Sequence, residues 1–172
     1  MTKPIIHGLE GREPVIGLNT WIAPGAVVVG EVYLGANCSI WYHAVLRADV
    51  APIRIGDDTN IQDGAMVHAT RDKSATVIGN RVTVGHRAII HGCTIEDEVL
   101  IGMGAIVLDN AYIESGAIVA AGAVILENTR IPAGTIWAGI PARQVKVLDS
   151  NISRERMREM AASYVGYKEL YR

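Results

Sequence analysis

The sequence predicts an all-β protein: a parallel β-helix of hexapeptide repeats with a C-terminal α-helix packed on its outside. Three observations lead to this fold class. A bulky aliphatic residue recurs at nearly every sixth position from Ile16 to Ile131. Four positions after it, the residue is usually small or β-branched. No helical periodicity of adequate length occurs before about residue 150. A fixed six-residue period is typical of a parallel β-helix, in which each coil stacks on the one before.

The repeat divides the chain into segments. Residues 1 to about 15 are expected to form a lead-in strand and turn. The solenoid then runs from Ile16 to about Pro141 in about twenty units, which make six to seven coils if three units form one coil. Two insertions interrupt it, at residues 50–54 and 69–77. Insertions in solenoids usually lie at functional edges, so both become candidates for a site.

The interior should consist of stacked aliphatic side chains. One hexapeptide cannot bury its own apolar residue, so each coil depends on its neighbours. A fully buried aliphatic contributes roughly 1.5–3 kcal/mol, and a column of them can stabilise a fold with little helix. Trp137 closes the series, and Pro141 cannot continue a β ladder. The sequence therefore predicts a β-helix domain over residues 1–147.

A helical pattern over residues 148–172 follows the solenoid. Ser150 or Ser153 is a plausible N-cap. The apolar stripe behind it is expected to pack on the prism. Its members are Met157, Met160, Ala161, Tyr164 and Val165.

Composition indicates a cytoplasmic globular protein. The 172 residues carry a formal net charge of −2 without a basic block, which disfavours nucleic acid and anionic membranes as partners. The N-terminus lacks the apolar run of a signal peptide, and the most apolar stretch, residues 116–126, is too short to span a bilayer. Cys38 and Cys93 are the two cysteines; we expect Cys38 to be a buried reduced thiol rather than half of a disulfide.

The repeat places two histidines above one another. Counted in threes, the units that contain Leu46, Val67 and Ile90 share one face in successive coils. The residues after them should form an outer column, each about 4.8 Å from the next. These residues are Arg47, His68 and His91. Two imidazoles at this spacing can converge on one metal ion, since Zn–N bonds need only about 2.0–2.1 Å.

His86 lies on a different face, where the coil below carries Gln62 and Asp63. Two faces of a prism point apart, so His86 of the same chain cannot readily reach a metal held by His68 and His91. A neighbouring copy can supply it. We therefore expect a cyclic homotrimer with three metal sites at its interfaces. Three neutral imidazoles with one open position are typical of a catalytic zinc site.

These residues resemble the signature of the gamma-class carbonic anhydrase family. The similarity covers the whole chain, including the residues 139–143 and the C-terminal helix. The motifs that carry it are Arg47-Ala48-Asp49, Asn60-Ile61-Gln62-Asp63-Gly64, His68, and His86 with His91. The resemblance implies a left-handed β-helix trimer, a hand that the period alone does not give.

The resemblance also implies roles for single residues. His68 and His91 of one subunit and His86 of the next would bind the metal. Arg47 and Asp49 would pair across the interface. Gln62 and Asn60 would contact the hydroxide or bicarbonate, with Gln62 orienting the nucleophile, and Tyr164 would line the site. Asp63 and Asp49 are best interpreted as fixing an imidazole or Arg47.

The implied activity is reversible hydration of carbon dioxide to bicarbonate. Zinc lowers the pKa of a bound water to about 7, and Fe²⁺ or Co²⁺ accepts the same ligands. The sequence departs from the family's active members in two places. Val50 replaces a glutamate, and the stretch 70–76 has Asp72 as its one carboxylate where they carry an acidic, proton-shuttling loop. His7 and His43 do not share the column and should be structural or solvated.

Other functions are compatible with the same fold, because fold alone does not determine function. One is a hexapeptide-repeat acyltransferase that uses a single histidine as general base and acyl-coenzyme A as donor. A variant of it is hydrolysis of acyl-coenzyme A thioesters at the same metal. The third is a catalytically silent scaffold whose metal holds the trimer together, which Val50 and the short loop favour.

Overall fold

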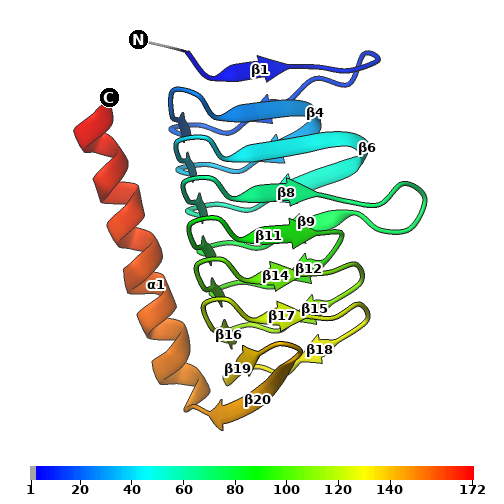
Figure 1. Cartoon of the computed structure of the whole chain (residues 1–172). Coiled ribbons are helices and arrows are strands. Elements are labelled where there is room, and N and C mark those ends of the chain that lie inside the picture. Colours follow the sequence, from blue (N-terminus) through cyan, green and yellow to red (C-terminus); the bar gives the residue numbers. More distant parts are fainter. Residues whose placement is uncertain (1–2) are drawn as a thin grey trace.

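The computed structural model describes residues 3–172 and is a parallel β-solenoid of about seven turns with one C-terminal helix beside it (Figure 1). The prediction of a hexapeptide-repeat solenoid is therefore confirmed. The chain begins with β1 (Ile5–His7), which pairs in parallel with β4, so the expected lead-in strand is present. No helix within residues 3–172 is both long and apolar enough to cross a bilayer.

The strands form two sheets that wrap around one core. The first sheet has two arms joined through the long strands β4 (Val27–Leu34) and β6 (Val45–Ile55). One arm contains β8 (Met66–His68), β11 (Ile89–His91), β14 (Ile106–Val107) and β17 (Val124–Ile125). The other contains β2 (Val15–Ile16), β9 (Thr76–Ile78), β12 (Thr94–Ile95), β15 (Tyr112–Ile113) and β18 (Arg130–Ile131).

The second sheet lies under the C-terminal helix. Its strands are β3 (Trp21–Ile22), β5 (Ser39–Ile40), β7 (Asn60–Ile61), β10 (Thr83–Val84), β13 (Leu100–Ile101), β16 (Ile118–Val119), β19 (Thr135–Gly139) and β20 (Ala142–Val147). All neighbours pair in parallel except β19 and β20.

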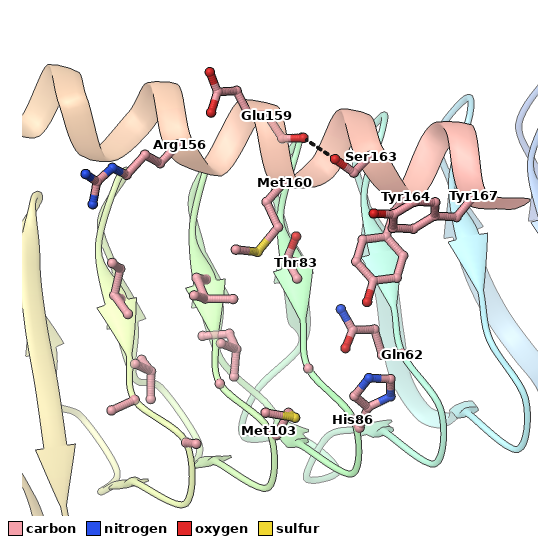
Figure 2. Close-up of a pocket in the computed structure, with 18 residues that line it drawn as sticks. Gln62, Thr83, His86, Met103, Arg156, Glu159, Met160, Ser163, Tyr164 and Tyr167 are labelled. Atoms are coloured by element: carbon pink, nitrogen blue, oxygen red, sulfur yellow. Dashed lines mark hydrogen bonds between the residues drawn. The ribbon is translucent and has the colours of Figure 1, made fainter.

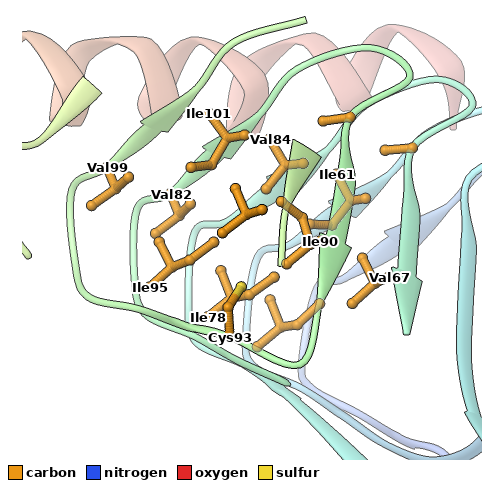
Figure 3. Close-up of a cluster of buried hydrophobic side chains, with 14 of the residues drawn as sticks. Ile61, Val67, Ile78, Val82, Val84, Ile90, Cys93, Ile95, Val99 and Ile101 are labelled. Atoms are coloured by element: carbon orange, nitrogen blue, oxygen red, sulfur yellow. The ribbon is translucent and has the colours of Figure 1, made fainter. Parts of the chain in front are cut away.

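The core is a stack of branched aliphatic side chains, one layer per coil (Figure 3). On the second sheet, Ile61, Val84 and Ile101 stand in register on successive strands and are fully buried. Cys38 and Cys93 are also buried, and both are free thiols. Desolvation raises the pKa of Cys38 to about 11 and that of Cys93 to about 12, so both stay protonated at neutral pH.

The break in the period at residues 50–54 suggested a loop there, but the structure shows a strand. These residues continue β6, because β4 runs beside them and pairs with β6 on both sides of the extra residues. The register between the strands shifts between Gly30 and Val32, so that residues 49–52 stand opposite Glu31 alone. A bulge of this kind keeps a strand paired while it absorbs extra residues.

Two features at the end of the solenoid also differ from the prediction. After Pro141 the chain reverses, and β20 pairs antiparallel with β19, so that Gly139 faces Ala142. The N-cap of the helix is Asp149, whose Oδ1 accepts from the backbone N–H groups of Asn151 and Ile152. Ser153 points inward instead and donates to the carbonyl of Gly116 at 2.7 Å.

Two polar anchors hold α1 (Ser150–Tyr167) and the 3₁₀ helix η1 (Lys168–Tyr171) along the second sheet (Figure 1). Between the anchors, Met157 and Ala161 of the predicted stripe are buried. Near one end, the buried carboxylate of Glu98 accepts from Arg158 at 2.6 Å, from Arg81 at 3.1 Å and from Arg154. At the other end, the buried ammonium of Lys168 donates to the carbonyls of Asn19 and Asn37, each at 2.8 Å.

The Glu98 anchor predicts acid sensitivity of the helix. Burial alone would raise the pKa of Glu98, but hydrogen bonds from the arginines lower it from 4.5 to about 2. A lowered pKa stabilises the fold above pH 4.5, and this contribution is lost as the pH falls from about 4.5 to 2. We expect Glu98→Gln to cost about 2 kcal/mol at pH 7 and little at pH 2, measured as free energy of unfolding by urea titration. An equal cost at both pH values would contradict this account.

Candidate metal centre

His68 and His91 lie one above the other, as predicted. They end β8 and β11, and the parallel register pairs them directly. Their ring centroids are 5.2 Å apart, and Nδ1 of His68 is 3.2 Å from Nε2 of His91. The hexapeptide repeat produces this contact, because it fixes Val67 and Ile90 inside the core and turns the next residue of each strand outward.

The outer nitrogen of each of these rings contacts a carboxylate. Nε2 of His68 is 2.9 Å from Asp49, and Nδ1 of His91 is 3.0 Å from Asp109. A carboxylate only accepts hydrogen bonds, so the outer nitrogens carry the protons. The inner nitrogens then present two lone pairs to each other at 3.2 Å. A metal ion between the rings would accept both lone pairs.

The spacing of the inner nitrogens fits a metal. Two imidazole ligands at about 2.0–2.1 Å from a tetrahedral zinc stand about 3.3 Å apart. The observed 3.2 Å matches that separation. Carboxylates behind metal-bound histidines are also the usual arrangement, because they fix the tautomer and orient the ring. The donor set of His68 and His91 is therefore suited to half of a zinc site.

His86 lies at a different corner of the prism, between β10 and β11, and has the same kind of support. Its Nδ1 is 2.9 Å from Asp63, the residue at the equivalent place one coil earlier. Its imidazole is 46% exposed, and Nε2 has no hydrogen-bond partner among the residues that the structure describes. Within residues 3–172 of one chain, no three side chains of His, Cys, Asp or Glu come together closely enough to hold a metal ion. His86 therefore does not join His68 and His91 within a single chain.

Gln62 stands beside His86 (Figure 2) and belongs to a buried chain of hydrogen-bonded polar side chains. Its Nε2 donates to Oδ1 of Asn60 at 3.1 Å, and Nδ2 of Asn60 donates to Oγ1 of Thr83 at 2.9 Å. Gln62 and Asn60 are 5% and 1% exposed. The amide orientation of Gln62 is thereby fixed, and its carbonyl oxygen stays free to accept a hydrogen bond. Thr83, which locks Asn60, was not predicted from the sequence.

Tyr164 reaches toward Gln62 from α1 (Figure 2). Both line a cavity of about 780 Å³ between the helix and the second sheet, with His86 at one end and a floor that includes Leu100 and Ile118. Burial raises the pKa of the Tyr164 hydroxyl, and the Asp63 carboxylate raises it further. The phenol is therefore a hydrogen-bond donor at neutral pH and not a base.

Known proteins share this sequence closely. A family model described as Bacterial transferase hexapeptide (six repeats) matches residues 13–48 and 92–127. Gamma carbonic anhydrase 1, mitochondrial, of Arabidopsis thaliana is 46% identical over 142 residues, 80% of this chain. A probable carbonic anhydrase of Methanocaldococcus jannaschii is 47% identical over 155 residues, covering 90% of this chain and 96% of its own. The chain belongs to the gamma-class carbonic anhydrase family.

The similarity covers nearly the full length of some relatives but only about half of others. The carbonic anhydrase of Geobacillus kaustophilus is 42% identical over 168 residues, covering 98% of this chain and 91% of its own. The chain spans about half the length, 52%, of the Arabidopsis relative. Among solved structures, a hexapeptide transferase family protein from Anaplasma phagocytophilum is 36% identical with a TM-score of 0.92, and each chain covers 98% of the other.

Asp109 is the main residue of the centre that the sequence reasoning missed. It lies two residues beyond the interior Val107, one coil after His91, where the repeat alone gives no reason for a carboxylate. The sequence did contain a hint of this role, because Asp63 also lies two residues after an interior aliphatic, Ile61. The hydrogen bonds of Ser74, Thr70 and His91 outweigh the effect of burial and lower the pKa of Asp109 to about 2.

The remaining predicted residues are placed as follows. Arg47 pairs with Asp49 within the chain, and their pairing across an interface stays a prediction. Val50 lies inside β6. His7 and His43 are exposed and lie outside the centre, as expected.

Proposed function

We propose that this protein hydrates carbon dioxide reversibly to bicarbonate, at metal sites shared between the subunits of a homotrimer. The single observation that carries the proposal is the shared arrangement of His68, His86 and His91. In each, one ring nitrogen contacts a carboxylate and the other is directed away from it. Zn²⁺ fits three neutral imidazoles with one open position, and Fe²⁺ or Co²⁺ accepts the same ligands.

The outer surface around the histidines supports a trimer. Six outward residues follow one another in register up this arm of the first sheet, and all are apolar. They are Val27, Val45, Met66, Ile89, Ile106 and Val124. Ile89, next to the histidine column, is 37% exposed. A continuous apolar ladder on the outside of a solenoid favours burial against a second copy, and a copy packed there brings its own His86 toward the pair.

Besides the metal, the reaction needs an oriented nucleophile, a hydrogen-bond donor for bicarbonate and a place for carbon dioxide, and residues of this chain can supply all three. A zinc ion in this site would supply hydroxide near neutral pH by lowering the pKa of water to about 7. Gln62, fixed by Asn60 and Thr83, would orient the nucleophile through its amide without competing for its proton. The Tyr164 hydroxyl would donate to a bicarbonate oxygen. The apolar floor of the cavity beside Gln62 suits carbon dioxide, which is itself apolar.

Metal removal tests the proposal. We expect purified protein to contain about one metal ion per chain, and chelation to reduce carbon dioxide hydration to the uncatalysed rate. Elemental analysis and stopped-flow hydration between pH 6 and 9 measure both quantities, and re-addition of Zn²⁺ or Co²⁺ should restore activity. Stoichiometric metal without hydration would instead support the silent scaffold, and hydration unaffected by chelation would refute the proposed chemistry.

Acyl transfer or acyl-thioester hydrolysis is a second candidate, favoured by one observation. The cavity of about 780 Å³ is much larger than a three-atom substrate requires. A structural relative from Bacillus cereus, 35% identical with a TM-score of 0.93, is provisionally described as an acetyltransferase. Incubation with acetyl-coenzyme A, with and without an amine or alcohol as acceptor, distinguishes the candidates: free coenzyme A thiol should appear only if the second is correct.

A further inference from the structure

The loop between β8 and β9, which is residues 69–75 of the predicted insertion at 69–77, folds back onto the metal centre. It projects from the side of the solenoid (Figure 1). Three of its side chains nevertheless turn toward a single carboxylate, that of Asp109. Thr70 Oγ1 donates to Oδ2 at 2.8 Å and Ser74 Oγ donates to Oδ1 at 2.7 Å, while Lys73 Nζ lies 3.3 Å from Oδ2.

These contacts leave Asp109 little freedom to turn away from His91. Both carboxylate oxygens are engaged: Oδ1 by Ser74 and His91, Oδ2 by Thr70 and Lys73. The side chain is 7% exposed, whereas the carboxylates behind the other two imidazoles, Asp49 and Asp63, are 29% and 43% exposed. A carboxylate with four partners and little contact with water has one orientation. Of the three carboxylate–imidazole contacts, its hydrogen bond to Nδ1 of His91 is therefore the most enclosed.

The backbone beside His68 and His91 is tied to Thr76, the first residue of β9 after this loop. Thr76 Oγ1 donates to the carbonyl of His68 at 2.6 Å and accepts from the N–H of Gly92 at 3.0 Å. Gly92 has φ of +56°, and a Cβ there would lie 1.9 Å from Ser74 Oγ and 2.1 Å from Asp109 Oδ1. Only glycine therefore lets Ser74 and Asp109 close over the backbone beside His91.

We propose that residues 70–74 form a latch that positions His91 through Asp109, holding Nδ1 protonated and Nε2 directed at the metal. The inference rests on the proposed metal site. In this account Asp109 is a positioning residue, and Thr70, Ser74 and Lys73 act by fixing Asp109. The loop thus has a role in place of the acidic proton shuttle that the family's active members carry at this position.

Two kinds of substitution test the latch. Asp109→Asn removes the charge that holds the His91 proton. The double variant Thr70→Val, Ser74→Ala leaves Asp109 intact and removes two of its donors. We expect the first to weaken Zn²⁺ binding by about 10- to 100-fold in competition with a chromophoric chelator, and the second by a smaller factor. Glu127→Gln is the matched control, because Glu127 contacts Lys73 at 2.9 Å but not Asp109. It should bind Zn²⁺ like the unmodified protein.

A second readout is independent of metal. In metal-free protein, ¹⁵N NMR of the imidazoles should show Nδ1 of His91 protonated, and this preference should decrease in Asp109→Asn. An unchanged tautomer in that variant would overturn the latch, as would unchanged Zn²⁺ affinity. A merely structural role would lower the free energy of unfolding without altering the tautomer. If the unmodified protein binds no metal, the proposed function fails, while the NMR result still decides whether the latch exists.

Discussion

Replacing His91 by Ala is expected to eliminate metal binding and reduce carbon dioxide hydration to the uncatalysed rate. His91 supplies one of the two inner nitrogens that stand 3.2 Å apart, and without it His68 alone remains on that face. Unassisted water has a pKa of about 15.7, against about 7 on zinc, so almost no hydroxide is available at neutral pH once the metal is lost. Elemental analysis and stopped-flow hydration measure the two effects together.

His43→Ala is the matched control for this substitution. His43 is also an exposed histidine of the solenoid, but it lies outside the centre. It has φ of +59°, so its loss tests whether a general disturbance of a coil corner is enough to inactivate the protein. We expect metal content and hydration to stay near those of the unmodified protein. Retention of both metal and activity in His91→Ala would show that the histidine column is not the metal site.

The second large effect concerns stability. Ile101→Ala is expected to lower the free energy of unfolding by about 3 kcal/mol, since it removes a fully buried side chain and leaves a cavity. Ile101 stacks between Val84 and Val119, so neighbouring coils lose contacts as well. Urea denaturation followed by circular dichroism measures the change.

Met103→Ala, in the same coil, provides the comparison. Met103 is 58% exposed, and substitutions at such positions usually change stability by less than about 0.5 kcal/mol. Equal costs at positions 101 and 103 would contradict an interior ladder as the main source of stability.

The regular part of the fold could be predicted because one physical rule repeats in every coil. An aliphatic such as Ile61 or Ile101 must face inward, and parallel stacking then fixes its neighbours. The structure differs from the prediction where a backbone or side-chain hydrogen bond, and not the burial of an aliphatic residue, determines the local conformation. Residues 50–54 remain a strand because β4 pairs with them across a bulge. The strand β20 forms by reversal against β19, which no period reveals. Asp149 caps the helix because Ser153 bonds to the solenoid instead.

The metal centre, like the fold, was predictable where the repeat positions its residues and not where side-chain hydrogen bonds do. His68 and His91 follow interior residues in successive coils, so the repeat alone brings them together. Thr83 and Asp109 act through hydrogen bonds to Asn60 and His91, and such bonds depend on side-chain directions that periodicity does not specify. The Asp109 contacts depend further on how an irregular loop folds. Loop conformation follows from its local contacts rather than from the hexapeptide rule.

Mixed assembly of two inactive variants tests the shared site most directly. His86→Ala and His91→Ala, each inactive alone, can be co-expressed with different affinity tags and isolated as mixed oligomers. In every mixed trimer, whichever variant is present twice, one interface of the three joins an intact His91 to an intact His86, so activity should return to about a third of that of the unmodified protein. Mixed oligomers that remain inactive, or a monomeric chain that hydrates carbon dioxide, would contradict a metal centre built between copies.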